Sequence, residues 1–173
     1  YFISKNERLA LAGGNGFFFP PTWPSSPVKK DRVPQSNAEP YILLVGSAFF
    51  ANIRGFKWFT EECAPHLNLN TVIAGSGMSS FFSSGDKITV YDYVDDLSSL
   101  YHNSSAVIVP IFNGAGIKIK ALEALIYEKY LVITDFAFEG LDYVFSDFDI
   151  FIKKANKASE FIESINNLPK SLN

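Results

Sequence analysis

A glycine-containing bend and the charged start of a helix follow the apolar run Ala106–Val109. Gly114 and Gly116 belong to the bend, and because glycine has no Cβ, a ligand can approach its backbone closely. The first turn of the following helix offers N–H groups and a partial positive charge, to which Lys118 adds a full positive charge. Glu123, further along the same helix, can accept hydrogen bonds from sugar hydroxyls. Together these residues predict a site for a nucleotide or a nucleotide sugar.

A purely structural interpretation of the same stretch stays open. In it, the glycines form only a tight turn, and Lys120 and Glu123 form a structural pair on one helix. The Gly114 and Gly116 pair lacks the third glycine of a dinucleotide fingerprint, which argues against a nicotinamide-dependent enzyme. The sequence has no Ser/His/Asp arrangement, no Walker lysine motif and no zinc-ligand spacing. We therefore expect no metal site and no required cofactor.

Length, charge and cysteine content limit the other possibilities. A chain of 173 residues with 47% hydrophobic and 19% charged residues is globular and can hold one ordinary domain, or one domain plus a fragment. The formal net charge of −3 provides no general basic surface, so we expect no nucleic-acid partner. Cys63, the single cysteine, can form no disulfide within the chain and fits a reducing compartment.

Features of targeting and of membrane insertion are missing from the sequence. No apolar run approaches the roughly 20 residues that a membrane-spanning helix needs, and no signal peptide is visible. We expect a cytoplasmic protein, either free or peripheral at the inner face of the membrane. Because the chain begins with Tyr1 rather than Met, we expect it to be a piece of a longer protein.

Two zones of different composition meet near residue 40. Residues 1–40 are proline-rich, and because proline is excluded from helix interiors and central strands, they predict the end of a preceding domain and a linker. From residue 41 to residue 173, strand-like and helix-like runs alternate. The expected strands are Tyr41–Val45, Thr71–Ala74, Ile88–Tyr91, Ala106–Val109, Tyr130–Thr134 and Asp149–Ile152. The expected helices are Asn52–Leu67, Asp95–His102 with Asp95 or Asp96 as N-cap, the helix after the glycine bend, and Ala158–Leu168.

Several of these strand runs are apolar throughout, which is typical of strands buried on both faces. The pattern predicts an α/β fold, a doubly wound (Rossmann-like) parallel sheet flanked by helices. In such sheets ligands bind beyond the carboxyl ends of the strands. We therefore expect the residues at the strand ends to converge on one cleft; they are Gly46, Gly75, Tyr91–Val94, Gly114–Gly116 and Thr134.

Five segments, in this order, resemble the donor-binding, C-terminal half of family-4 glycosyltransferases of GT-B fold, particularly bacterial polysaccharide enzymes. They are Ile42–Ser47 with Asn52–Phe59, Val72–Gly77, Tyr93–Leu97 with Leu100–Tyr101, Pro110–Ala124, and Thr134 with Glu139–Leu141. Order and spacing agree over roughly Tyr41 to Leu168. The resemblance implies one half of a GT-B architecture that takes a nucleotide-diphosphate sugar as donor and retains the anomeric configuration. The glycan or lipid-linked acceptor would bind a separate half, and residues 1–40 would be the end of that half and the linker.

The resemblance also implies roles for individual residues. The diphosphate would be held by the loop after the first strand and by the glycine bend, namely Gly46, Ser47, Gly114, Ala115, Gly116, Ile117 and Lys118. The backbone of Tyr93 and Val94 would contact the base, and Glu123 would bind the ribose hydroxyls. No catalytic residue is assigned, and Lys118 and Glu123 are the best candidates for supporting roles.

Two departures from the family pattern affect these roles. The usual Arg/Lys pair near the first strand has no clean match, and Arg54 is a candidate for one member of it. The first of two glutamates that many members carry falls on Ala115 here, which argues against direct carboxylate contact with the donor sugar. Half of a sugar-nucleotide epimerase and a non-catalytic α/β nucleotide-binding module remain as alternatives. A receiver-like module fits poorly, because Gly46 and Ser47 stand where acidic residues are needed, and a flavin-binding module would be yellow.

Overall fold

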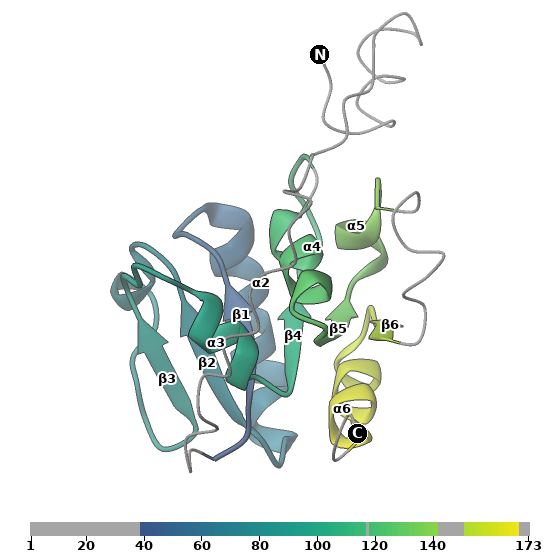
Figure 1. Ribbon diagram of the computed structural model, residues 1–173, viewed down its shortest axis with the longest axis horizontal. Coiled ribbons are helices and arrows are strands. Elements are labelled where there is room, and N and C mark those ends of the chain that lie inside the picture. Colours follow the sequence, from purple (N-terminus) through teal and green to yellow (C-terminus); the bar gives the residue numbers. More distant parts are fainter. Residues whose placement is uncertain (1–38, 117, 142–150, 170–173) are drawn as a thin grey trace, which may run out of the picture.

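The computed structural model describes residues 39–116, 118–141 and 151–169 (Figure 1). The predicted linker therefore lies outside the described residues except for its last two positions, and so does Ile117.

Six parallel strands form one sheet in the order β3-β2-β1-β4-β5-β6. The strands are β1 (Tyr41–Val45), β2 (Asn70–Ala74), β3 (Ile88–Tyr91), β4 (Ala106–Val109), β5 (Tyr130–Ile133) and β6 (Ile152–Lys154). This is the order of a doubly wound sheet, so the fold prediction is confirmed. The chain builds outward from β1 to β3, then returns to the centre and builds outward again from β4. The order therefore reverses between β1 and β4, which are neighbours.

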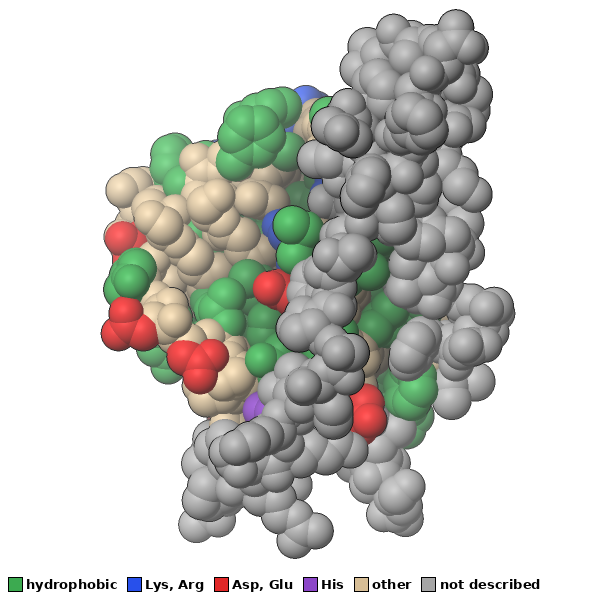
Figure 2. Space-filling model, turned by 45° about the horizontal axis from the view of Figure 1, so that its top comes forward, with side chains coloured by type: hydrophobic (Ala, Val, Ile, Leu, Met, Phe, Trp, Pro, Cys, Tyr) green, Lys and Arg blue, Asp and Glu red, His purple; other side chains and the backbone are tan. Residues whose placement is uncertain are grey.

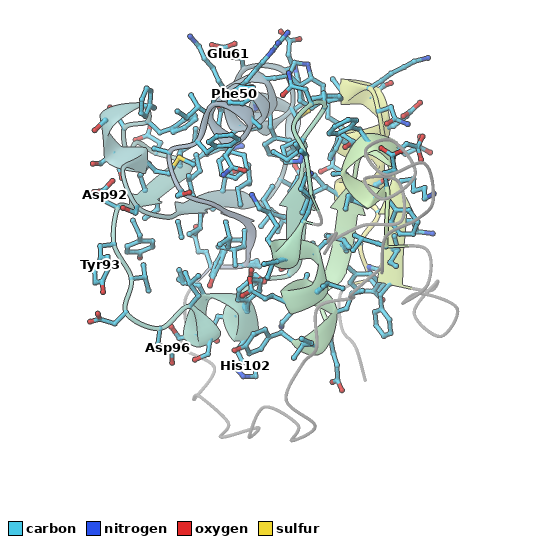
Figure 3. The ribbon with its side chains drawn as sticks, turned by 90° about the horizontal axis from the view of Figure 1, so that it is seen from above. Phe50, Glu61, Asp92, Tyr93, Asp96 and His102 are labelled. Atoms are coloured by element: carbon cyan, nitrogen blue, oxygen red, sulfur yellow. The ribbon has the colours of Figure 1, made fainter. Side chains whose placement is uncertain are left out.

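Helices cover both faces of the sheet. α2 (Phe50–Glu62) packs against α6 (Ala158–Asn166) through edge-to-face contacts of Phe161 with Trp58 and Phe59. α3 (Ser98–Asn103) packs against α4 (Ile119–Ile126) on the opposite face. In the view onto the carboxyl ends of the strands, Phe50 and Glu61 of α2 lie on one side of the sheet and His102 of α3 on the other (Figure 3). The short α5 (Asp135–Phe138) follows β5.

The core lies between the sheet and these helices. All of β4 is buried, as expected of a central strand covered on both faces. α4 buries Ala121, Leu122, Ala124 and Leu125, and its two charged residues, Lys120 and Glu123, lie outside this apolar face. The charged residues near the glycine bend are therefore fixed in orientation by the packing of this apolar face.

The boundaries of several elements differ from the sequence expectation, by one or two residues in β2, β5 and α6 and more informatively in α2, α3 and β6. α2 ends at Glu62 and a separate turn of 3-10 helix follows (Ala64–His66), because Pro65 cannot continue the α-helical hydrogen bonds. The N-cap of α3 is Leu97, so the prediction of Asp95 or Asp96 was wrong, although Asp96 accepts hydrogen bonds from the backbone N and Oγ of Ser98. β6 begins at Ile152, where the expected strand ended, and the first two expected positions lie outside the described residues.

Within the described residues, no helix is both long enough and apolar enough to cross a membrane.

Candidate functional site

The reversal of strand order between β1 and β4 creates a cleft at the carboxyl end of the sheet. Loops that leave neighbouring strands in opposite directions cannot fill the space between them, and this is where doubly wound folds bind ligands. A cleft of about 210 Å³ lies there. Its lining comes from the start of α2, the loop after β4 and the start of α4: Phe49, Ala51, Asn52, Ile111, Asn113, Gly114, Ala115, Lys118, Ile119 and Lys120.

This cleft is electropositive. Among the described residues, two lysines and no carboxylate line it. The first turns of α2 and α4 contain no acidic residue, and neither N-cap residue caps its helix with a side-chain hydrogen bond. Because the N-terminus of a helix carries a partial positive charge, both helices add to the charge of the lysines. In Figure 2, which is turned to bring this end toward the reader, small patches of Lys or Arg lie beside hydrophobic side chains. The cleft is therefore suited to an anion.

The glycine bend forms one wall of the cleft, as the sequence predicts. Gly114 and Gly116 have φ values of 121° and 75°, conformations that side-chain-bearing residues rarely adopt. Gly114 and Ala115 are exposed. The ammonium of Lys118 bonds back to the bend, with its Nζ 2.6 Å from the carbonyl oxygen of Gly116 and 3.3 Å from that of Ala115. Lys118 is therefore held at the mouth of the bend, where it lines the cleft.

Lys120, which the sequence argument assigned only to a structural pair, lies deeper in the same cleft. Its Nζ donates to Oδ1 of Asn52 at 2.6 Å and lies 5.3 Å from the centre of the Phe56 ring. Asn52 in turn donates from Nδ2 to the carbonyl oxygen of Ser47 at 2.8 Å. A chain of hydrogen bonds thus joins α4, α2 and the loop after β1. No ion pair forms between Lys120 and a carboxylate of the described residues, Glu123 included.

Burial lowers the pKa of Lys120 to about 7, because protein atoms replace water around its ammonium. The positive charge of Lys118 lowers it further, while the negative charge of Glu123 opposes both effects. The residue keeps partial exposure because the cleft reaches it. A lysine with its pKa near neutrality in a cleft marks a candidate binding or catalytic group.

Gly46 gives Lys120 and Asn52 access to the end of β1. A Cβ on Gly46 would lie 2.7 Å from Lys120 Nζ and 2.6 Å from Asn52 Nδ2, closer than real contacts allow. The absence of a side chain at Gly46 therefore leaves room for the side chains of Lys120 and Asn52. Ser47, the next residue, is exposed and contributes its carbonyl oxygen to Asn52.

Glu123 lies one turn beyond Lys120 on α4 and does not line the cleft. Its Oε2 accepts a hydrogen bond from the hydroxyl of Tyr101 at 2.7 Å. Tyr101 is buried and stacks on Tyr127 with ring centres 4.9 Å apart. Burial and then the charge of Glu123 raise the pKa of Tyr101, which keeps the phenol protonated as a donor. The carboxylate of Glu123 is therefore held in place by Tyr101 of α3.

The remaining predicted residues are spread along this end of the sheet. Arg54 is exposed on α2 and does not line the cleft. Tyr93 is 75% exposed and, with the half-buried Val94, follows β3 at the sheet edge, away from Phe50 (Figure 3). Thr134 is buried, accepts from Ala137 N as the N-cap of α5, and donates to the carbonyl of Ile111. Thr134 thus supports the cleft wall from behind instead of facing a ligand.

Among the described residues, no group of three or more His, Cys, Asp or Glu side chains is placed to hold a metal ion. The charged side chains among the described lining residues are the ammonium groups of Lys118 and Lys120, which suit an anionic ligand better than a cation.

A known protein family matches the described part of the chain. Residues 39–170 match the family described as "Glycosyl transferases group 1". The chain belongs to this family. The match covers every strand and helix described above, including both walls of the cleft.

Two known proteins are similar to this group 1 glycosyl transferase chain. An "Uncharacterized 44.6 kDa protein in cps region" of Klebsiella pneumoniae is 27% identical over 157 residues, which is 80% of this chain and 39% of that protein. This chain thus spans well under half the length of that relative. The crystal structure of the glycosyltransferase SnogD from Streptomyces nogalater aligns with a TM-score of 0.42 and 14% identity, over 88% of this chain and 46% of that one.

Proposed function

We propose that this chain is the donor-binding half of a glycosyltransferase, and that it holds a nucleotide-diphosphate sugar in the cleft between β1 and β4. The observation that carries the proposal is the cleft itself, in which a glycine bend, two helix N-termini and two lysines meet, with no carboxylate among the described lining residues. Membership of the group 1 glycosyl transferases supports a sugar nucleotide as the anion.

In this proposal the diphosphate occupies the cleft and the rest of the donor extends along the carboxyl end of the sheet. Lys118 would exchange its bond to the Gly116 carbonyl for one to a phosphate oxygen. Glu123 would meet the ribose, and the segment of Tyr93 and Val94 would meet the base. A separate half of the enzyme would bind the acceptor, which would be a polysaccharide, another glycan or a lipid-linked glycan.

The chemistry that follows is electrostatic. When the bond between the sugar and the diphosphate breaks, negative charge develops on the leaving phosphate oxygens. Lysine ammonium groups and backbone N–H groups that already face this position stabilise the charge without rearranging, and losing one such contact typically costs about 3 kcal/mol of barrier. We propose transfer with retention of anomeric configuration, as in the family-4 enzymes that the sequence resembles.

A thermal-shift screen against UDP-, GDP-, ADP- and CMP-linked sugars tests the donor assignment. A diphosphate-linked sugar at about 100 times its Kd should stabilise the chain by roughly 2.7 kcal/mol. CMP-linked sugars contain one phosphate and serve as the matched control. The proposal fails if no diphosphate-linked sugar stabilises the chain more than its CMP-linked counterpart. We expect the chain alone to bind the donor and to turn over nothing.

A further inference from the structure

The strongest unexplained feature of the cleft is the environment of Lys120. A lysine ammonium has three N–H donors, and the described contacts use one of them, for Asn52 Oδ1. The other neighbour, Phe56, is fully buried and offers only its ring face. Removing a charge from water without a hydrogen-bonded counter-charge is costly, and proteins normally compensate it.

The cleft offers the place for a compensating anion. Lys120 lines it together with Asn52, Gly114 and Ala115, so that its donors can reach a ligand there. Gly46, at the end of β1, has no side chain to fill the space next to the ammonium. The first turns of α2 and α4 add partial positive charge without any acidic residue to neutralise it.

We propose that Lys120 is a diphosphate-binding residue of this cleft and that Asn52 holds its ammonium in position until the ligand arrives. The inference rests on the proposed function for the identity of the ligand, but the site itself requires only a pyrophosphate group. Asn52 is the positioning residue, because its Nδ2 is anchored on the Ser47 carbonyl and only its Oδ1 meets Lys120.

A purely structural role of Lys120 predicts different effects on stability and on anion binding when its charge is removed. If the Lys120–Asn52 bond serves only to join two helices, removing the charge lowers stability and leaves anion binding intact. If Lys120 binds the ligand, removing its charge also removes the free-energy cost of burying that charge in the free protein. The free energy of unfolding then stays equal or rises, while anion binding is lost.

Calorimetric titration of the full chain with inorganic pyrophosphate near pH 6.5, combined with thermal melting, separates the two. We expect Lys120→Met to weaken pyrophosphate binding about tenfold or more, with a melting temperature at or above that of the unmodified chain. Lys57→Met is the matched control, because Lys57 is exposed on α2 and pairs with Glu61 away from the cleft. It should bind pyrophosphate as the unmodified chain does.

Asn52→Asp provides a second, independent variant. It places a carboxylate beside Lys120, where it competes with the ligand, and should weaken pyrophosphate binding while the ammonium remains. If Lys120→Met does not fold, the single variants Lys120→Arg and Asn52→Asp provide the same test. We expect Lys120→Arg to keep pyrophosphate binding and Asn52→Asp to weaken it.

The outcomes distinguish this inference from the proposed function. Unchanged pyrophosphate binding in Lys120→Met and Asn52→Asp, or no pyrophosphate binding by the unmodified chain, overturns the role of Lys120 and leaves the donor screen to decide the function. Lys120-dependent pyrophosphate binding with no additional affinity for nucleotide sugars supports the role of Lys120 and refutes the proposed function.

Discussion

Lys120 on α4 and Asn52 on α2 meet at 2.6 Å, although their helices cover opposite faces of the sheet and 68 residues separate them in the chain. The contact forms above the point where strand order reverses, between β1 and β4. It connects the two halves of the doubly wound sheet at the position where such folds bind ligands. Gly46 lies next to this contact, where a Cβ would meet both side chains.

Gly46→Ala should weaken ligand binding without unfolding the protein. The added Cβ would meet the ends of two side chains, Lys120 and Asn52, and both can move away at small cost. We expect pyrophosphate or donor affinity to fall by about tenfold and the melting temperature to change little. Gly85→Ala is the matched control, since a Cβ there meets no atom within 4 Å. Equal binding by the two variants would show that the position of the pair does not matter.

Gly55→Ala should instead destabilise the fold. Ala is favoured over Gly inside a helix by about 1 kcal/mol, so propensity alone predicts a gain. However, a Cβ on Gly55 would lie 2.1 Å from the backbone carbonyl oxygen of Pro110, which cannot move without displacing the end of β4. We expect the overlap to dominate and to lower the free energy of unfolding by about 1–3 kcal/mol, measured by urea denaturation. A more stable variant would contradict the close packing of α2 on this strand.

Binding of a nucleotide sugar should take up a proton at pH 8. Because the pKa of Lys120 is about 7 in the absence of ligand, most of these side chains are neutral there, and an anion favours the charged form. The neighbouring charges are Lys118 and Glu123, and the contacts from α2 are the neutral Asn52 and Phe56. Calorimetry in buffers of different ionisation enthalpy measures the uptake. It should vanish in Lys120→Met, and equal uptake by both proteins would assign the proton elsewhere.

The same pKa predicts how stability depends on pH. Unfolding returns the pKa of Lys120 from about 7 to 10.5, so between these values the unfolded chain binds a proton that the folded chain does not. The contribution of Lys120 to the free energy of unfolding therefore rises with pH over this window and is constant below it. Chemical denaturation from pH 6 to pH 10 should show this rise in the unmodified chain relative to Lys120→Met. Parallel curves for the two proteins would contradict the lowered pKa.

Tyr101→Phe should separate recognition of the ribose from recognition of the diphosphate. The change removes the hydroxyl that fixes the Glu123 carboxylate and keeps the stacked ring. If Glu123 meets the ribose, affinity for a nucleotide sugar should fall several-fold while pyrophosphate binding stays the same. Tyr127→Phe is the control, because it keeps the same stack and leaves the Tyr101–Glu123 bond intact. A loss of pyrophosphate affinity in Tyr101→Phe would instead indicate a general disturbance of α4.

Local patterns were sufficient to predict the fold. Apolar runs such as Ala106–Val109 indicate buried parallel strands without knowledge of their neighbours. The glycines after β4 predict a bend, and the structure builds it with positive φ at Gly114 and Gly116. The alternation of strands and helices predicts a doubly wound parallel sheet with right-handed crossovers, whereas the strand order depends on long-range packing and was not predicted.

The site could be predicted only where it is local in sequence. The bend and Lys118 lie within one segment, and the structure places both at the cleft. Lys120 pairs with a residue on a distant helix, so its position depends on how α2 and α4 approach each other. Its place in the first turn of α4, two residues after Lys118, was the one signal available. Arg54 was predicted as a site residue and does not line the cleft. It is only two residues from Asn52, but two residues are about half a helical turn, which places Arg54 on the exposed surface of α2.

All the groups that line the cleft in the described part of the chain belong to this one unit of the fold. If the donor binds there, it can do so before any acceptor is present. Steady-state kinetics of a complete enzyme built on this unit should then follow an ordered scheme, with the sugar nucleotide adding first and the nucleoside diphosphate leaving last.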